Sequence, residues 1–487
     1  MRLSGLRPAE ALAERPSGEP SSYLRGSCEC AGLLSLSMSA LPAADAAAVP
    51  VTRGYIVVLD NSVTDPSALG GQQTRRIGGE RSAVYSHALK GYAATLTADQ
   101  AEKLAEQPHV RFVSPQHSYR NGPPRQPTTL TDCRPSPVDR QCRPVFIDRI
   151  RADRSSTRSG DGRGTVGVNV AVLDDGIDAE VPDLNVRGGV DCLSGSPVVP
   201  GLSLRDPGFH GTMVAGIIGA RDDAQGLVGV APGTPIWSVK VADDTGYISD
   251  AAFLCGLDWL ASTRTDGDPA NDIAIANMSL GSDPTEPPAD MDDGHCGTVN
   301  DDAAHLAICN VTNHGVTSVV AAGNHTVDLA RTVPAAYDEV ITATAMADFD
   351  GKPGGKVKPL CYGRDFGFYG DADDEASLPF SNFARSTGDR RHTVAAPGVC
   401  MESNVPLPYH HAFGDGTSFA SPAVAGVLAL WVQTHRCGDS TPARNLRTLI
   451  GDAHTYNEQR PTYGFFGDPH RPVPGRYYGP LIAADRY

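Results

Sequence analysis

The sequence has no long hydrophobic run: no stretch approaches the roughly 18–20 apolar residues that a helix needs to cross a bilayer. It also lacks clusters of Lys and Arg, and its net charge of −16 argues against nucleic acid or an anionic membrane as the main partner. A glycine-rich phosphate loop is missing after the first strand of the main region, which argues against a nucleotide-binding α/β protein. The remaining composition, with 20% charged residues, is that of an ordinary globular protein.

The length of 487 residues exceeds what a single core usually holds, which predicts one large domain and an accessory one. Composition and periodicity change along the chain at four places. The segments that result are a leader (1–46), a small module (54–120), a Pro-, Thr- and Arg-rich linker (121–144), a main domain (145–455) and a tail (456–487). The tail shows no core pattern and is expected to add neither an anchor nor a second catalytic module.

The leader contains CAGLLSLSMSALPAADA, a short apolar stretch that ends in small residues. This is the pattern of a secretory signal, and the alternative is a disordered leader. We predict that the protein is secreted.

Eleven cysteines also favour an oxidising compartment. Short loops favour the pairs Cys133–Cys142 and Cys296–Cys309, and a third pair, Cys361–Cys400, is proposed without such support. Zinc binding is the competing interpretation, but no tandem close Cys pairs occur outside the leader.

The module at 54–120 combines predicted strands and one predicted helix. GYIVVLD, SHALKGYAATL and HVRFVSP have strand patterns, and Thr97 with Gln100 forms a capping box for the helix ADQAEKLAEQ. At about seventy residues the module is too small to carry catalysis by itself. An independent small binding domain is one interpretation.

The main domain alternates apolar strands with helix-like segments, a pattern that predicts a parallel sheet with helices on both faces. The strands are VAVLD, IWSVKV, IAIANMSL, SVVAAGN and VITATA. Ligands of such folds bind at the carboxyl ends of the strands, where Asp174 and Asn324 fall. The fold class is therefore α/β, preceded by a small α+β module.

Four residues in this domain are candidates for catalysis. Asp174 ends a buried strand, and His210 opens the small-residue helix HGTMVAG. Asn324 closes SVVAAGN, and Ser418 lies in GDGTSFASPAVAG, where a tight turn enters a helix. A serine there exposes its hydroxyl and its backbone N–H, as nucleophilic attack on a carbonyl requires. Taken singly, each residue could simply cap a turn or a helix.

The order Asp, His, Asn, Ser on these motifs resembles that of the subtilisin-like (subtilase) serine proteases over roughly residues 140–455. The resemblance implies that Asp174 orients His210, that His210 is the general base for Ser418, and that Asn324 donates to the oxyanion. Asp175 stands where the family usually has Ser or Thr, which leaves an ambiguity of one residue about the acid.

The resemblance also implies a substrate groove. Ser279, Leu280 and Gly281 would form one edge of it, and Ala322 and Gly323 would lie beside the primary specificity pocket. A core strand with a terminal bend is the alternative for the first three residues. The 54–120 module, through ALKGYAATLT and VRFVSPQ, resembles the inhibitor propeptide of secreted subtilases, whose end would occupy the cleft until cut.

The sequence therefore predicts a secreted, self-processing serine endopeptidase; the alternative is a catalytically inactive protein-binding module of the same fold. The partners expected are polypeptide substrates and the chain's own propeptide, with no nucleic acid and no membrane, and we expect a monomer. No cofactor is required for the chemistry. Two acid-rich loops, PPADMDDGHCGTVNDD and YGDADDEAS, could hold structural calcium or be solvated, and neither spacing defines metal ligands.

Overall fold

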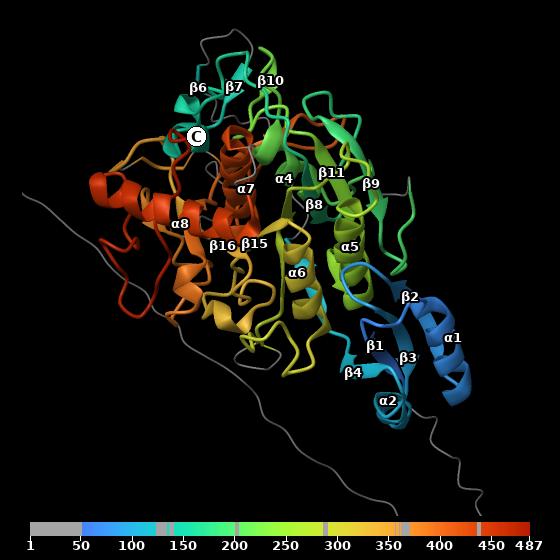
Figure 1. Ribbon diagram of the computed structural model, residues 1–487. Helices are drawn as coiled ribbons and strands as arrows, with labels where there is room; N and C mark the ends of the chain where they lie inside the picture. Colours follow the sequence, from blue (N-terminus) through green and yellow to red (C-terminus); the bar gives the residue numbers. More distant parts are fainter. Residues whose placement is uncertain are drawn as a thin grey trace, which may run out of the picture. The chain divides into compact units, whose positions relative to one another are not determined.

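The computed structural model describes residues 51–122, 134–135, 141–199, 204–285, 291–355, 357–359, 361, 371–435 and 440–487 (Figure 1). The predicted leader and most of the predicted linker lie outside these residues. In the described part of the chain, no helix is both long and apolar enough to cross a membrane.

The N-terminal module is an antiparallel sheet of four strands in the order β2-β3-β1-β4, with two helices. Its elements are β1 (Arg53–Leu59), α1 (Pro66–Ile77), β2 (Glu80–Tyr85), β3 (Gly91–Leu96), α2 (Ala98–Ala105) and β4 (Val110–Pro115). The capping box of α2 is confirmed, since Thr97 and Gln100 each accept a hydrogen bond from the other's backbone N–H, at 3.2 and 2.8 Å. Two elements were not predicted, α1 and β2, and residues 86–90 are not part of a strand.

The main domain contains the predicted parallel sheet, in the order β17-β16-β15-β13-β8-β11-β9, with β18 paired to β16. The strands are β8 (Val170–Asp174), β9 (Val186–Asp191), β11 (Ile236–Lys240), β13 (Ile275–Met278), β15 (Thr317–Ala321), β16 (Ile341–Ala347), β17 (Glu375–Ala376) and β18 (Thr393–Pro397). Every pairing is parallel except that of β17. The central strands are buried along their whole length, as expected for a sheet covered on both faces.

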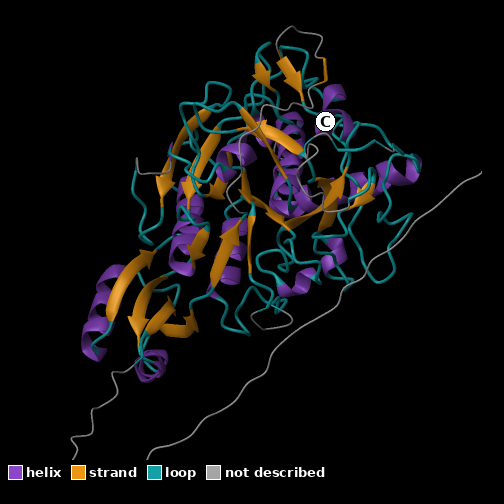
Figure 2. Ribbon diagram, turned by 180° about the vertical axis from the view of Figure 1, so that it is seen from behind, coloured by secondary structure: helices purple, strands orange, loops and turns teal. Residues whose placement is uncertain are grey.

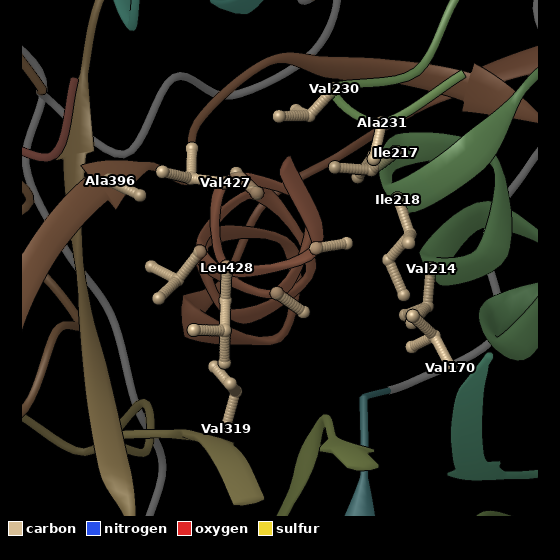
Figure 3. Packing of buried hydrophobic residues seen from close by; sticks show 14 of the residues in the cluster. Val170, Val214, Ile217, Ile218, Val230, Ala231, Val319, Ala396, Val427 and Leu428 are labelled. Atoms are coloured by element: carbon tan, nitrogen blue, oxygen red, sulfur yellow. The ribbon is translucent and has the colours of Figure 1, made fainter. Parts of the chain in front are cut away.

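Helices pack on both faces of this sheet (Figures 1 and 2). One face carries α4 (His210–Gly219), α7 (Thr417–Thr434) and α8 (Pro442–Gln459), and the other carries α5 (Asp250–Thr263) and α6 (Ala303–Asn313). Figure 3 shows how tightly the first face is filled: Leu428 of α7 lies close to Val319 of β15, and Val214 of α4 lies close to Val170 of β8. This packing fixes the helices that begin at the carboxyl ends of the strands.

Shorter elements surround the sheet. They are α3 (Val145–Arg149), the sheet of β10 (Gly226–Leu227), β7 (Gln141–Arg143) and β6 (Arg134–Pro135), the hairpin of β19 (Met401–Asn404) and β20 (His411–Gly414), and the sheet of β12 (Tyr247–Ser249), β5 (Ser118–Asn121) and β14 (Leu280–Ser282). The 3₁₀ turns Ala152–Arg154, Leu329–Arg331 and Asp389–Arg391 also belong to the described part of the chain. The β5 strand forms the end of the N-terminal module and reaches the first residue of the predicted linker, whereas β12 and β14 belong to the main domain.

The prediction that the tail beyond residue 456 lacks a core pattern is wrong. Helix α8 continues to Gln459, and Tyr463, Phe465, Tyr478 and Leu481 join a buried cluster with residues of β16 and β18. The backbone N–H of Ala395 in β18 also donates to the carbonyl of Pro480 at 2.9 Å. The tail is irregular backbone that buries aromatic side chains, so neither helical nor strand periodicity marks its core residues.

Three disulfides join described cysteines. Cys296–Cys309 and Cys361–Cys400 confirm two predicted pairs, and Cys192–Cys255 was not predicted. The third predicted pair includes Cys133, which lies outside the described residues. The unpredicted disulfide is closed across 63 residues and ties the end of β9 to α5.

Candidate active site

Asp174 and His210 form a buried hydrogen-bonded pair where β8 ends and α4 begins. The His210 Nδ1 atom lies 2.8 Å from Oδ1 and 2.9 Å from Oδ2 of Asp174, and both side chains are fully buried. Burial by itself raises the pKa of Asp174, but the His210 imidazole and the hydrogen bonds from His210, Asn121 and Asp175 hold it below its usual value. A carboxylate here keeps the proton on Nδ1 and leaves Nε2 as the acceptor.

The second ring nitrogen of His210 is available for proton transfer. Nε2 is buried and has no hydrogen-bond partner in the described part of the chain. The imidazole packs against the ring of Phe419, with 5.4 Å between centroids, and Phe419 directly follows Ser418 in α7. The free nitrogen therefore belongs to a ring that contacts the first turn of α7.

Ser418 is the second residue of α7 and is almost fully buried, with 4% of its surface exposed. Its Oγ donates a hydrogen bond to the carbonyl of Ser279 at 3.3 Å, and the Ser279 hydroxyl donates to the carbonyl of Ser418 at 2.7 Å. Gly416 precedes the helix with φ 144°, a backbone conformation that favours glycine. Hydrogen bonds of a catalytic serine often form only once substrate is bound, so the present Oγ partner is compatible with transfer of its proton to His210.

The amide of Asn324 is oriented by the turn before Ser418. Its Oδ1 accepts hydrogen bonds from the backbone N–H and the Oγ1 hydroxyl of Thr417, both at 2.9 Å. Because a backbone N–H can only donate, the atom that faces it is the oxygen, which turns Nδ2 away as a free donor. Asn324 is exposed and lines the same cavity as Ser418.

That cavity has a volume of about 380 Å³. Of the residues predicted to bind substrate, Leu280, Gly281 and Gly323 line it. Ser279 and Ala322 do not line it and are fully buried. Their carbonyls bond within the protein: that of Ser279 accepts from Ser418, and that of Ala322 accepts from the Asn382 amide at 2.9 Å.

Strand β5 lies along this cavity. It pairs antiparallel with β12 on one side and with β14 on the other, with Tyr119 opposite Ile248 and Ser282. At its end, the Asn121 amide donates to Asp174 Oδ1 at 2.7 Å, and Gly122 lines the cavity together with Ser418. The segment thus occupies the position in which an extended peptide would bind by strand addition.

The N-terminal module is also held at a second point, by an acid of α5. Both carboxylate oxygens of Asp258 accept backbone N–H groups of Ser86, His87 and Ala88, at 2.6 to 3.1 Å. Burial raises the pKa of Asp258 although these hydrogen bonds oppose it. The apolar face of the module sheet that includes Ile56 packs in the same cluster as α5 and α6.

Two further buried acids, Asp175 and Asp206, lie beside Asp174 at the start of α4. Asp175 accepts from the backbone N–H of Gly211, and Asp206 accepts from that of Thr212, each at 2.8 Å. Burial and the neighbouring carboxylates raise the pKa of Asp175 well above its usual value, and burial raises the pKa of Asp206 to about 6. These two acids cap the helix that carries His210. This role was not predicted from the sequence, where its signal is the pair Asp174-Asp175.

One group of acids in a predicted calcium loop surrounds a histidine. Asp292, Asp293 and His305 lie together, and His305 Nε2 is 3.0 Å from Glu339 Oε2. Burial opposes protonation, but Glu339 and Asp292 raise the pKa of His305. Asp293 accepts three backbone N–H groups of its own loop at 2.8 to 2.9 Å. An imidazolium with acidic partners fits this group better than calcium, which prefers oxygen ligands.

The other acidic group, Asp348, Asp350 and Asp373, already has a cation beside it. The buried Arg149 guanidinium lies 2.9 Å from Asp348 and 2.7 Å from Asp374. Asp373 accepts the backbone N–H of Phe349 at 2.8 Å. Arg149 and this N–H group compensate part of the charge, while burial and the neighbouring carboxylates raise the pKa of Asp348 to about 8 and that of Asp373 above its usual value.

Comparison with protein families gives two matches. The family described as "Subtilase family" matches residues 165–465, and the family described as "Peptidase inhibitor I9" matches residues 54–121. The first match covers more than half of the 487 residues.

Individual relatives agree with these matches. The chain is 32% identical over 317 residues to M-protease of Shouchella clausii, covering 64% of this chain and 67% of the relative. It is 31% identical to Subtilisin Savinase of Lederbergia lenta (64% and 94% covered) and 27% identical to Subtilisin E of Bacillus subtilis (75% and 77% covered). Among solved structures, fervidolysin from Fervidobacterium pennivorans, described as a keratinolytic enzyme related to subtilisin, has a TM-score of 0.59 at 20% identity. That match covers 90% of this chain and 60% of fervidolysin, and it shows a shared fold.

Proposed function

This chain belongs to the subtilase family and is a serine-type endopeptidase with an I9-type propeptide, and on this premise we propose that Asp174, His210 and Ser418 form its catalytic triad. The observation that supports this most strongly is the buried hydrogen bond of 2.8 Å between His210 Nδ1 and Asp174, beside the first turn of α7. It leaves the second nitrogen of the imidazole free to act as the proposed base for Ser418.

In the proposed reaction, Ser418 Oγ attacks the substrate carbonyl while His210 Nε2 takes its proton. Asp174 stabilises the imidazolium that forms. The imidazolium then gives the proton to the leaving amine, the C–N bond breaks, and an acyl-enzyme remains on Ser418. Water attacks the acyl group by the same route, with His210 as base, and releases the acid and the free serine. No step requires a cofactor.

The oxyanion is proposed to bind between Asn324 Nδ2 and the backbone N–H of Ser418. Helix α7 begins at Thr417, so the N–H of Ser418 belongs to the first turn, whose donors have no partner within the helix. The orientation of the Asn324 amide by Thr417 supports this role because it fixes the donor before substrate arrives.

The Asn324→Ala variant tests the oxyanion site. We expect kcat to fall about 10²–10³-fold with little change in KM, which is the magnitude measured for the equivalent loss in a subtilisin of the same family. Steady-state hydrolysis of a peptide substrate measures both constants. An Asn324→Ala enzyme with an unchanged kcat would remove Asn324 from the mechanism.

We also propose that the chain processes itself within the linker at 121–144 and that the module at 54–120 then inhibits the mature enzyme. The support is the position of β5, which fills the strand position between β12 and β14, and the hydrogen bond from Asn121 to Asp174. We propose residues 145–455 as the catalytic domain and residues 1–46 as the leader.

Secretion is proposed from the disulfides, since three described pairs are expected of a protein folded in an oxidising compartment. Structural calcium and a monomeric state stay predictions from the sequence. The experiment that tests the proposed function is hydrolysis of a denatured protein by the purified product of the full chain, with and without a serine-directed phosphonate. Hydrolysis that the phosphonate blocks is expected, whereas a folded product that hydrolyses nothing would favour an inactive binding module.

A further inference from the structure

The Tyr119 side chain of β5 enters a pocket at the start of α5. Its ring packs against Phe253, with 4.8 Å between centroids at an angle of 46°. Its hydroxyl donates a hydrogen bond of 2.8 Å to Oδ1 of Asp250, the first residue of α5. Only 1% of Tyr119 and 2% of Asp250 are exposed, so the phenol and the carboxylate meet away from water.

Asp250 depends on this segment for its donors. Its second oxygen, Oδ2, accepts the backbone N–H of His117 at 2.7 Å. Among the described residues, no lysine or arginine forms a salt bridge with Asp250. When the propeptide leaves, the carboxylate therefore loses both side-chain and backbone partners that come from residues 117–119.

An extended substrate would bring a side chain to the same place. Strands β12 and β14 belong to the main domain, and an incoming peptide that pairs with them as β5 does puts one residue opposite Ile248 and Ser282. Residues 118–122 and Ser418 all line the cavity, and Asn121, the last residue of β5, donates to Asp174 of the site. Taking the next residue, Gly122, as the one presented to the serine puts the counterpart of Tyr119 three positions before it.

We propose that Asp250 and Phe253 make the protease selective for tyrosine at the fourth residue before the cleaved bond. This inference rests on the proposed function and adds a specificity residue to it. The Phe253 ring favours an aromatic partner, and the buried carboxylate requires a hydroxyl that donates to it. Phenylalanine would fill the pocket but leave the carboxylate without a donor, and sites built to bind a hydroxyl reject such analogues strongly.

The protonation of Asp250 is consistent with this role. Burial raises its pKa to about 6, while His117 and the hydrogen bond from Tyr119 oppose the increase. Near pH 8 the group is therefore a carboxylate and can only accept. Burial and the nearby Asp250 raise the pKa of Tyr119 well above its usual value, which keeps the phenol proton in place.

The test uses fluorogenic peptides that copy residues 119–121, Tyr-Arg-Asn-Xaa, and the same series with Phe in place of Tyr, where Xaa is varied. The active protein obtained from the full chain is assayed at pH 8. We expect kcat/KM to be at least about tenfold higher for Tyr than for Phe. In the Asp250→Ala variant the ratio is expected to fall to about twofold or less.

The matched control is Asp258→Asn, which changes an acid of the same helix that accepts hydrogen bonds from residues 86–88 and, among the described residues, none from β5. It should keep the wild-type ratio of Tyr to Phe. If Asp250→Ala yields no active protein, the wild-type ratio decides, and cleavage sites in a digest of denatured protein show whether Tyr exceeds Phe at the fourth position.

Two results would overturn the inference while leaving the proposed function intact. One is a wild-type ratio near one with both peptides hydrolysed, and the other is a high ratio that persists in Asp250→Ala. Failure to hydrolyse either peptide series or the denatured protein would instead refute the proposed function.

Discussion

Replacement of Ser418 by Ala is expected to abolish hydrolysis and to leave the chain uncut between the N-terminal module and the main domain. The side chain that would form the acyl-enzyme is lost, while the methyl group fits the space of a nearly buried residue. The expected loss of kcat is about 10⁶-fold, which is the order of magnitude measured for removal of the nucleophile in subtilisin, a relative of this chain. Mass spectrometry of the purified chain and a peptide assay measure the two effects.

The matched control is Ser421→Ala, three residues further along α7. The Ser421 hydroxyl donates to Asn277 Oδ1 at 2.8 Å and does not line the cavity. Its loss should lower stability by about 1 kcal/mol while processing continues. If a Ser418→Ala chain, purified from other proteases, still cut itself at the linker, Ser418 would not be the nucleophile.

Replacement of Asp174 by Asn is expected to lower kcat about 10⁴-fold, the size of effect seen when the acid of a Ser-His-Asp triad becomes an amide. The amide is nearly isosteric, so the fully buried site should keep its shape. An NH₂ group that faces Nδ1 would force the imidazole proton onto Nε2, which removes the base. Peptide hydrolysis, corrected for the unprocessed fraction, measures the loss.

Asp175→Asn separates the two adjacent acids. Burial and nearby carboxylates raise the pKa of Asp175 well above its usual value, which favours the neutral carboxyl that Asn resembles. The amide oxygen can still accept from Gly211, so we expect a loss of at most about tenfold. A larger effect from Asp175→Asn than from Asp174→Asn would reverse the assignment of the triad acid.

The sheet and the positions of the candidate residues could be predicted because their signals are local, whereas the roles of these residues were inferred from the resemblance to subtilases. Asp174 ends an apolar strand, and His210 and Ser418 follow turns and begin helices rich in small residues. In a parallel α/β sheet the carboxyl ends of the strands and the starts of the following helices lie at the same edge. These three side chains could therefore be expected to lie near one another without knowledge of the strand order. The capping box at Thr97 could be recognised for the same reason, since both partners lie within one helical turn.

Other features depended on contacts that a linear sequence conceals. Helix α1 has Asp65 and Pro66 at its start and Gly78 at its end, but Gly70 and Gly71 in its middle weaken the helical signal. Cys192 and Cys255 are 63 residues apart and meet only because β9 and α5 pack together. No sequence period connects them.

The specificity pocket could not be predicted either. Asp250 opens α5, where an acid usually serves only the helix dipole and N–H groups. Its interaction with Tyr119 spans 131 residues and requires β5 to lie between β12 and β14. Only the folded chain brings the phenol, the carboxylate and Phe253 together.

The most direct test of the catalytic assignment is to react the processed protein with a serine-directed phosphonate and to locate the adduct by mass spectrometry. We predict one adduct, on Ser418 in the peptide that contains GTSFASPAVAG. An adduct on another serine, or none on protein that still hydrolyses its substrate, would contradict the assignment.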